Sequence, residues 1–234
     1  MTVKIIGICG SPRKGGNTEI LVKEALLGAQ AVKDAKTSFL SLAGKKIGHC
    51  TGCLACERQR RFCVVPDDFP EFFKGYMEAD GIILGSPVYH LSITSTLKAA
   101  IDRLGQSMFA IYRGKLPRLC KVGGAVTQGN SLYGGQEFAL QFMINSFILE
   151  NCLVVSGDSP QSKIGVPAST GADSTRGSIR KNENALLLSR SLGRRVAEMA
   201  GIVKAGMKEL APDLGPEYFE AKHLELLQVH LNKK

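Results

Sequence analysis

Residues 3–18 spell VKIIGICGSPRKGGNT, and this stretch decides the fold. The apolar run Val3–Cys9 is typical of a strand that is buried on both faces of a sheet. A glycine-rich turn, Gly10–Asn17, follows it, and we expect a helix over Thr18–Ala31. The first backbone N–H groups of a helix are free, and its dipole is positive there, so this turn suits a phosphate group.

The rest of the chain repeats this alternation of strand and helix. Four more strands are expected, at Thr37–Leu42, Gly81–Gly85, Leu119–Thr127 and Cys152–Ser156. Helices are expected from Asp67 or Asp68 to about Met77, and at Thr94–Phe109, Gln136–Glu150 and Lys181–Lys204. Such alternation gives right-handed crossovers and a parallel sheet. We therefore predict an α/β, flavodoxin-like fold: a five-stranded parallel sheet in the order 2-1-3-4-5, with helices on both faces and ligands at the carboxyl ends of the strands.

The domain organisation follows from this pattern. Residues 1–205 are expected to form one domain, with a cysteine-rich loop at 48–66, outside regular structure, after the second strand. A C-terminal extension, 206–234, is expected to follow, with a helix around Glu217–Leu231. The long polar loop Asp158–Arg180 either covers the site or builds a subunit interface.

Composition and charge indicate a globular protein and exclude some classes of partner. The 234 residues are 44% hydrophobic and 22% charged, which is ordinary for a globular protein. The net charge of +9 is spread along the chain without the patterns of nucleic-acid-binding motifs, so we expect no nucleic-acid partner. There is no signal-peptide-like start and no apolar run of bilayer length, so we expect no membrane association and a cytoplasmic location.

The turn after the first strand carries phosphate-binding chemistry. Ser11, Asn17 and Thr18 supply short donors, and Arg13 and Lys14 supply positive charge. The turn lacks the Gly-Lys-Ser/Thr of a P-loop and the Gly-x-Gly-x-x-Gly of a dinucleotide fold. The alternative is a plain connection with a helix cap.

Two further loops are expected at the same edge of the sheet. Gly85-Ser86-Pro87-Val88-Tyr89-His90 ends the third strand, and residues 127–137 (TQGNSLYGGQE) follow the fourth. Histidine titrates near neutral pH, so His90 is a candidate proton donor, although it equally suits a loop residue that only packs.

Four of the seven cysteines crowd together, in the spacing Cys50-x2-Cys53-x2-Cys56-x6-Cys63. Iron–sulfur clusters are commonly held by four cysteines at short spacings of this kind. Structural zinc also takes four thiolates, although zinc ribbons usually separate two Cys-x2-Cys pairs by a longer stretch. Unligated cysteines are the third possibility. The odd total argues against a disulfide framework.

These motifs together resemble the iron–sulfur flavoprotein and NADPH-dependent FMN reductase family. Gly-Ser-Pro-Arg followed by Asn-Thr is similar to its FMN phosphate loop, and Pro-Val-Tyr is similar to its flavin loop. The resemblance implies that the ribityl phosphate is held by Ser11, Arg13, Asn17 and Thr18. It implies that the flavin ring is bordered by Pro87, Val88, Tyr89, His90, Thr127, Gly129, Gly134 and Gly135. It also implies a four-iron cubane on Cys50, Cys53, Cys56 and Cys63.

The expected function is an oxidoreductase that contains FMN and an iron–sulfur cluster. Electrons would pass from a reduced carrier through the cluster to FMN and on to a small acceptor such as a quinone, oxygen or peroxide. The basic group Arg58, Arg60 and Arg61 suits an acidic carrier such as ferredoxin, and it equally suits a solvated loop. The resemblance also implies a homodimer or homotetramer. The alternatives are an NAD(P)H-dependent FMN or quinone reductase without a redox cluster, a non-enzymatic electron carrier like flavodoxin, and a DNA-binding redox sensor.

Overall fold

The computed structural model describes residues 1–113, 118–215, 218, 225 and 228–229. Its strands are β1 (Val3–Cys9), β2 (Ala35–Ser41), β3 (Gly81–Pro87), β4 (Val122–Gly129), β5 (Leu153–Val154) and β6 (Val166–Ser169). Its α-helices are α1 (Asn17–Gln30), α2 (Ala55–Gln59), α3 (Phe69–Glu78), α4 (Ser95–Ile111), α5 (Gln136–Leu149) and α6 (Glu183–Glu209). Two 3-10 turns, η1 (Ser178–Lys181) and η2 (Ala211–Asp213), flank α6.

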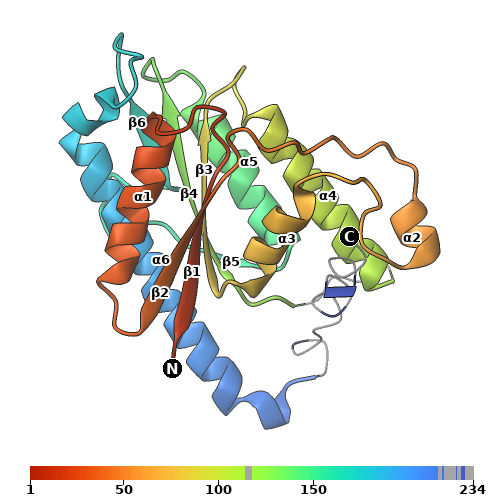
Figure 1. Cartoon of the computed structure of the whole chain (residues 1–234). Helices are drawn as coiled ribbons and strands as arrows, with labels where there is room; N and C mark the ends of the chain where they lie inside the picture. The colour runs from red at the N-terminus through yellow and green to blue at the C-terminus, as the bar shows by residue number, and fades with distance from the viewer. Residues whose placement is uncertain (114–117, 216–217, 219–224, 226–227, 230–234) are drawn as a thin grey trace.

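The predicted strand order is confirmed. The sheet runs β2-β1-β3-β4-β5, and every one of these pairings is parallel. β1 lies between β2 and β3, with Ile5 paired with Thr37 of β2 and with Gly81 of β3. The carboxyl ends of β1, β3 and β4 therefore lie side by side at one edge of the sheet, at the top of Figure 1.

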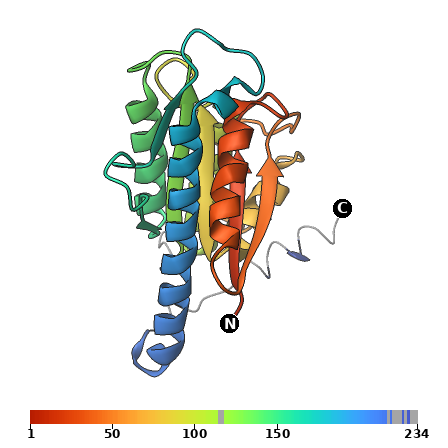
Figure 2. The ribbon, with the colours of Figure 1, turned by 90° about the vertical axis from the view of Figure 1, so that its left-hand side faces the viewer.

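Helices cover both faces of the sheet because alternate residues of each strand point to opposite sides. Ile6 and Ile8 of β1 belong to a core that packs under α3, α4 and α5. Ile5 and Cys9 of β1 belong to a second core that packs under α1 and α6. Figure 2 shows α1 and α6 running side by side over this second face, with α6 continuing beyond the sheet. The residues of β1 from Ile5 to Cys9 are all apolar and buried, because both faces of this strand lie against a core.

The edge strand of the sheet is split, and this was not predicted. β5 pairs with Val122 and Gly123 of β4, while β6 pairs with β4 further along, from Val126 to Gly129. The expectation that 158–180 is a loop throughout is therefore wrong at Val166–Ser169. This strand has only four residues and contains Pro167, which is tolerated at a sheet edge but hides the strand pattern in the sequence.

Two other expectations change in detail. The cysteine-rich loop contains a short helix, α2, whose two flanking residues Leu54 and Arg60 both have left-handed backbone conformations. The last helix, α6, extends past the expected Lys204 to Glu209, so the predicted domain boundary at 205/206 falls inside a helix. The expected helix at 217–231 lies almost wholly outside the described residues.

Candidate functional site

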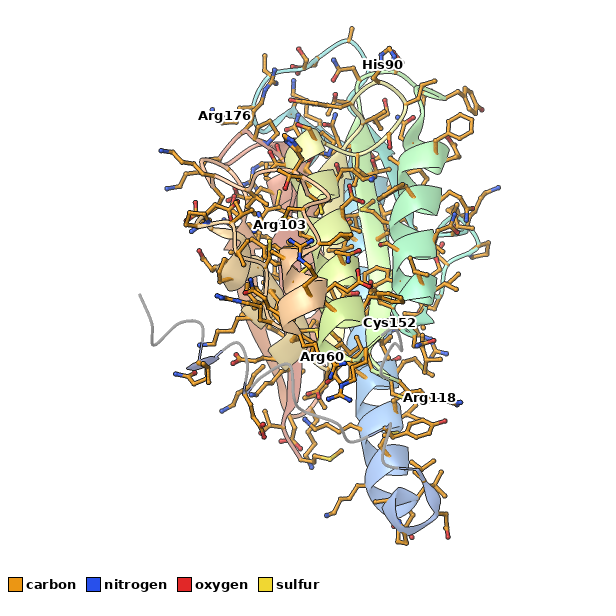
Figure 3. The ribbon with its side chains drawn as sticks, turned by 90° about the vertical axis from the view of Figure 1, so that its right-hand side faces the viewer. Arg60, His90, Arg103, Arg118, Cys152 and Arg176 are labelled. Atoms are coloured by element: carbon orange, nitrogen blue, oxygen red, sulfur yellow. The ribbon has the colours of Figure 1, made fainter. Side chains whose placement is uncertain are left out.

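Three loops meet in one cavity of about 480 Å³ at the carboxyl edge of the sheet. They follow β1, β3 and β4, and a fourth segment from residues 174–176 joins them. The lining residues are Ser11, Arg13, Gly16, Asn17, Thr18, Pro87, Val88, Tyr89, His90, Leu91, Gln128, Gly129, Asn130, Ser131, Gly134, Ser174 and Arg176. Figure 3 shows the two outermost labelled members, His90 and Arg176, at the same end of the molecule. The cavity thus brings together ten of the twelve predicted cofactor-binding residues.

The first loop is tied into a tight turn before α1. The backbone N–H of Arg13 donates to Ser11 Oγ (3.2 Å), and that of Gly16 donates to Arg13 O (3.1 Å). The N–H of Gly15 donates to the carboxylate of Glu19 (2.8 Å), which also pairs with Lys23. Burial by itself would raise the pKa of Glu19, but these hydrogen bonds outweigh it and hold the pKa below its ordinary value. Glu19 therefore stays ionised and shapes the turn, a role that the sequence did not reveal.

Asn17 lines the cavity at the first turn of α1, and its side-chain amide is already engaged. Its Nδ2 donates to Thr175 O (3.1 Å) and to Ser178 Oγ (3.1 Å). Its Oδ1 accepts from the N–H of Gly177 (2.8 Å). The Asn17 side chain thus fastens the distant 174–179 segment onto α1.

That segment contributes Ser174 and Arg176, which sequence reasoning missed. Arg176 is exposed and lines the same end of the cavity as Arg13, beside the start of α1. The two guanidinium groups and the positive end of the α1 dipole make this end of the cavity suitable for an anion. A basic residue within a Gly/Ser-rich segment, residues 169–178 (STGADSTRGS), is the signal that would have pointed to it.

The second loop is a two-residue hairpin turn after β3. Tyr89 and Ser92 exchange both backbone hydrogen bonds, of 2.8 and 3.0 Å, around His90 and Leu91. His90 and Leu91 both have positive φ angles, 47° and 64°, as a type I′ turn requires. The turn places His90 at an exposed tip of the cavity wall. The base of the loop is fixed to the neighbouring strand, since the N–H of Val88 donates to Gln128 O (2.8 Å).

The third loop joins β4 to α5 and lines one wall of the cavity. Gln136 Nε2 donates to Ser131 O (2.7 Å), which closes the loop over the start of α5. Gly129 and Gly134 line the cavity as predicted. The other two predicted residues play supporting parts: Thr127 is fully buried, with its hydroxyl donating to Ser86 O (2.9 Å), and Gly135 caps α5 with a φ of 102°.

All four clustered cysteines line a second, smaller cavity of about 60 Å³. Cys56 on α2 is buried, Cys63 is half-buried, and Cys50 and Cys53 are exposed. Hydrogen bonds from the Ala55 N–H and the Thr51 side chain lower the pKa of the Cys53 thiol, whereas burial raises that of Cys56. Over the described part of the chain, no three His, Cys, Asp or Glu side chains stand in an arrangement that would hold a metal ion. The thiols therefore share one cavity but have not converged on a common point.

A buried arginine on α4 forms part of the wall of this cysteine cavity. The Arg103 side chain is 1% exposed, and its Nη1 donates to Asp67 Oδ2 (2.5 Å) and to Gly48 O (3.2 Å). Its Nε and Nη2 have no hydrogen-bond partner among the described residues. A cavity that carries four thiols and a partly unpaired buried cation fits an anionic, thiolate-bound group.

Comparison with known proteins agrees with this geometry. The family model of NADPH-dependent FMN reductases matches residues 3–166. An iron–sulfur flavoprotein of Methanocaldococcus jannaschii is 39% identical over 202 residues, covering 86% of this chain and 100% of the relative. An iron–sulfur flavoprotein of Archaeoglobus fulgidus is 33% identical over 198 residues, covering 83% of this chain and 96% of the relative.

A likeness to a solved structure shows the same fold. The crystal structure of a flavodoxin-type, WrbA-like protein from Agrobacterium tumefaciens superposes with a TM-score of 0.54 and 18% identity, covering 86% of this chain and 99% of that one.

The fold and the carboxyl-edge cavity define a flavodoxin-like flavoprotein. The chain belongs to the iron–sulfur flavoprotein and NADPH-dependent FMN reductase family, and it is a flavin-dependent oxidoreductase whose cofactor is FMN. In the part of the chain that the structure describes, none of the helices has an apolar stretch that would span a lipid bilayer.

Proposed function

We propose that this protein is an electron-transfer oxidoreductase that carries FMN in the carboxyl-edge cavity and an iron–sulfur cluster on Cys50, Cys53, Cys56 and Cys63. The single observation that supports it best is the presence of two separate cavities in one chain, one basic and loop-lined, the other lined by four thiols. FMN supplies the ability to exchange one or two electrons, and the protein supplies position and electrostatics.

The FMN phosphate would lie at the basic end of the carboxyl-edge cavity. Ser11, Arg13 and Thr18 belong to the first loop and the start of α1, and Arg176 reaches the same end from the far side. Backbone N–H groups at the start of α1 have no partner within the helix, so they are available to phosphate oxygens. The flavin ring would then lie between the second and third loops, where the wall is mostly backbone, Pro87, Val88 and Tyr89.

Within the proposal, His90 supplies protons to the acceptor. It stands at the exposed tip of the hairpin turn that borders the ring. An imidazole in that position can exchange protons with water and with a small molecule entering the cavity. The acceptor would be a quinone, oxygen, peroxide or a molecule of similar size.

Electrons would enter through the cysteine cavity. Arg58, Arg60 and Arg61 are all exposed on the loop that contains Cys56 and Cys63, so they offer a basic surface to an acidic carrier such as ferredoxin. Among the described residues the two cavities share no lining residue. We therefore propose a homodimer or homotetramer in which the cluster of one subunit serves the flavin of another.

The electron route is tested by rapid mixing of the purified, cofactor-loaded chain with either reduced ferredoxin or NADPH, without oxygen. Flavin bleaching is followed in wild type and in Cys56→Ser. The proposal predicts that reduced ferredoxin bleaches the wild-type flavin and does so far more slowly in the variant. If NADPH instead bleaches both proteins at the same rate and ferredoxin bleaches neither, the chain is a simple NAD(P)H-dependent flavin reductase.

A further inference from the structure

Part of the Arg103 guanidinium has no hydrogen-bond partner among the described residues. This side chain is among the largest fully buried ones, on the inner face of α4. The Asp67 carboxylate and the Gly48 carbonyl both bind the same nitrogen, Nη1. The guanidinium lies over the ring face of Phe69, with Cζ 4.2 Å from the ring centre, and this contact leaves the in-plane N–H donors free.

Three N–H donors of a buried cation are thus left over, one on Nε and two on Nη2. Neither nitrogen has a hydrogen-bond partner in the described part of the chain. The Asp67 carboxylate balances the charge of Arg103, but buried donors are themselves paired in nearly all folded proteins. These donors therefore indicate a ligand that the polypeptide itself does not supply.

The neighbourhood identifies the chemistry of that ligand. Arg103 lines the cavity that holds Cys50, Cys53, Cys56 and Cys63. Gln106 and Ser107, one turn further along α4, line the same cavity. α4 therefore contributes three polar side chains to the cavity that the four cysteines line. Thiolates and bridging sulfides accept N–H hydrogen bonds and carry negative charge.

We propose that Arg103 donates hydrogen bonds from Nε and Nη2 to the sulfur atoms of the cluster and thereby raises its reduction potential. The inference rests on the proposed function, since it requires that a cluster is bound. The sign follows from charge: the reduced cluster is more negative by one electron, so a fixed buried cation stabilises it more than the oxidised cluster. Asp67 acts as the positioning residue that holds the guanidinium over the ring of Phe69.

The arginines on the loop are expected to matter far less. Arg58, Arg60 and Arg61 carry the same charge but are exposed, so water and salt screen them. Arg58→Gln is therefore a matched control for Arg103→Gln, because both remove one positive charge from the surroundings of the same cluster.

The experiment uses the full-length chain, loaded with iron, sulfide and FMN without oxygen. Iron and labile sulfide are assayed, flavin binding reports folding, and the cluster potential is measured by titration followed by electron paramagnetic resonance. We expect Arg103→Gln to shift the equilibrium toward the oxidised cluster at least tenfold, about 59 mV for one electron, or to lose iron. Arg58→Gln should change the equilibrium by less than about threefold.

Arg103→Lys distinguishes an effect of Arg103 on the cluster potential from a role in pairing with Asp67 alone. A lysine can keep the charge and the pair with Asp67, but it lacks the planar fork and the Nε–H. We expect this variant to bind FMN normally and to have a lower cluster potential than wild type. Wild-type iron content and potential in both Arg103→Gln and Arg103→Lys would overturn the inference, because Arg103 would then serve only as the partner of Asp67.

A measurement without any change at Arg103 covers the case in which its variants do not fold. In the chain labelled with ¹⁵N-arginine and carrying Arg58→Gln, Arg60→Gln and Arg61→Gln, the reduced cluster should show hyperfine coupling to an arginine nitrogen. Absence of that coupling in a cluster-loaded sample would overturn the inference. A wild-type chain that holds neither iron nor labile sulfide would instead overturn the proposed function, and the role of Arg103 with it.

Discussion

The carboxyl-edge cavity and the cysteine cavity differ in how completely the polypeptide builds them. The walls of the first are tied together by buried bonds between segments far apart in sequence: the Thr94 hydroxyl donates to Gly10 O (2.7 Å), and Asn17 fastens the 174–179 segment. In the second, Cys50 and Cys53 are exposed, and only Cys56 is buried. The proposed flavin site is thus held together by the fold, whereas the four cysteines are held less completely by contacts within the chain.

The anchors of the cysteine loop lie at its ends. Phe62 is buried against Phe69 and Phe73, at centroid distances of 5.2 and 4.8 Å. At the other end, Asp67 accepts from the Gly48 N–H (2.8 Å) and from Arg103. Between these fixed points, residues 50–61 run beside α4, at the right of Figure 1. A metal site commonly gains its final geometry when the metal binds. Under the proposed function, FMN would therefore meet a finished site, whereas the cluster would complete its own.

The largest effect is expected from removing a cluster ligand. Cys56→Ser should reduce bound iron from about four per chain to almost none, because a hydroxyl is a poor substitute for the thiolate. FMN should still bind, since its cavity is built by other residues. Iron and flavin assays check both points, and Cys120→Ser, outside the loop, is the control that should keep its iron. Loss of FMN together with iron would show that the two sites are not independent.

A smaller effect is expected at the basic end of the carboxyl-edge cavity. Arg176→Gln should weaken FMN binding by about tenfold to a hundredfold, because a charge-assisted hydrogen bond contributes about 1.5–3 kcal/mol. Fluorescence quenching of added FMN measures the dissociation constant. Arg180→Gln removes the same charge four residues further on, outside the cavity lining, and should change the affinity little. Equal effects of the two variants would mean that only the net charge matters.

Asn17→Ala tests whether the 174–179 segment is held in place for the flavin. Losing its side-chain bonds should lower the free energy of unfolding by about 1–3 kcal/mol and weaken FMN binding roughly as much as Arg176→Gln does. Because Asn17 would act by placing Arg176, the double variant should bind FMN about as weakly as Arg176→Gln alone. Additive losses in this cycle would show that Asn17 acts on the flavin independently.

The smallest effect is expected on the pH dependence of the free energy of unfolding. It comes from Glu150, which lines neither of the two cavities. Burial raises the pKa of Glu150, at the end of α5, to about 7. The folded chain therefore keeps this proton at pH values where the unfolded chain has lost it. Between about pH 4.5 and 7 the free energy of unfolding should fall as pH rises, by at most about 1.4 kcal/mol per pH unit. Denaturant unfolding of wild type and Glu150→Gln measures the slope, which the variant should lack while keeping FMN and iron; an identical slope in both would contradict this.

Much of the fold was predictable because the residue pattern within single segments indicates a strand or a helix. Val3–Cys9 is apolar and buried on both faces of the sheet, as expected, except for the exposed Lys4. The strand at Val166–Ser169 escaped prediction because four residues with one proline give too little pattern and only pairing with β4 defines it. In the same way α2 depends on left-handed residues at both of its ends, Leu54 and Arg60, which no propensity favours.

The candidate site was predictable where residues close together in the sequence also line the same cavity. Ser11, Arg13 and Thr18 lie in one turn, and the structure places them in one cavity wall. Arg176 and Ser174 were missed because tertiary contacts bring their segment to the site. These contacts are the pairing of β6 with β4 and the hydrogen bonds of Asn17, more than 150 residues away in the sequence. Arg103 was missed for a different reason: its significance lies in hydrogen bonds that are absent among the described residues, and sequence patterns do not show absent bonds.

The most direct test of the whole account is the cofactor content of the chain purified without oxygen. The visible spectrum is recorded, and FMN, iron and acid-labile sulfide are assayed per chain. The account predicts one FMN with about four irons and four sulfides per chain, and a broad absorption shoulder that bleaches on reduction. A clean flavin spectrum with neither iron nor sulfide would contradict it and would leave the cysteine cavity without its proposed ligand.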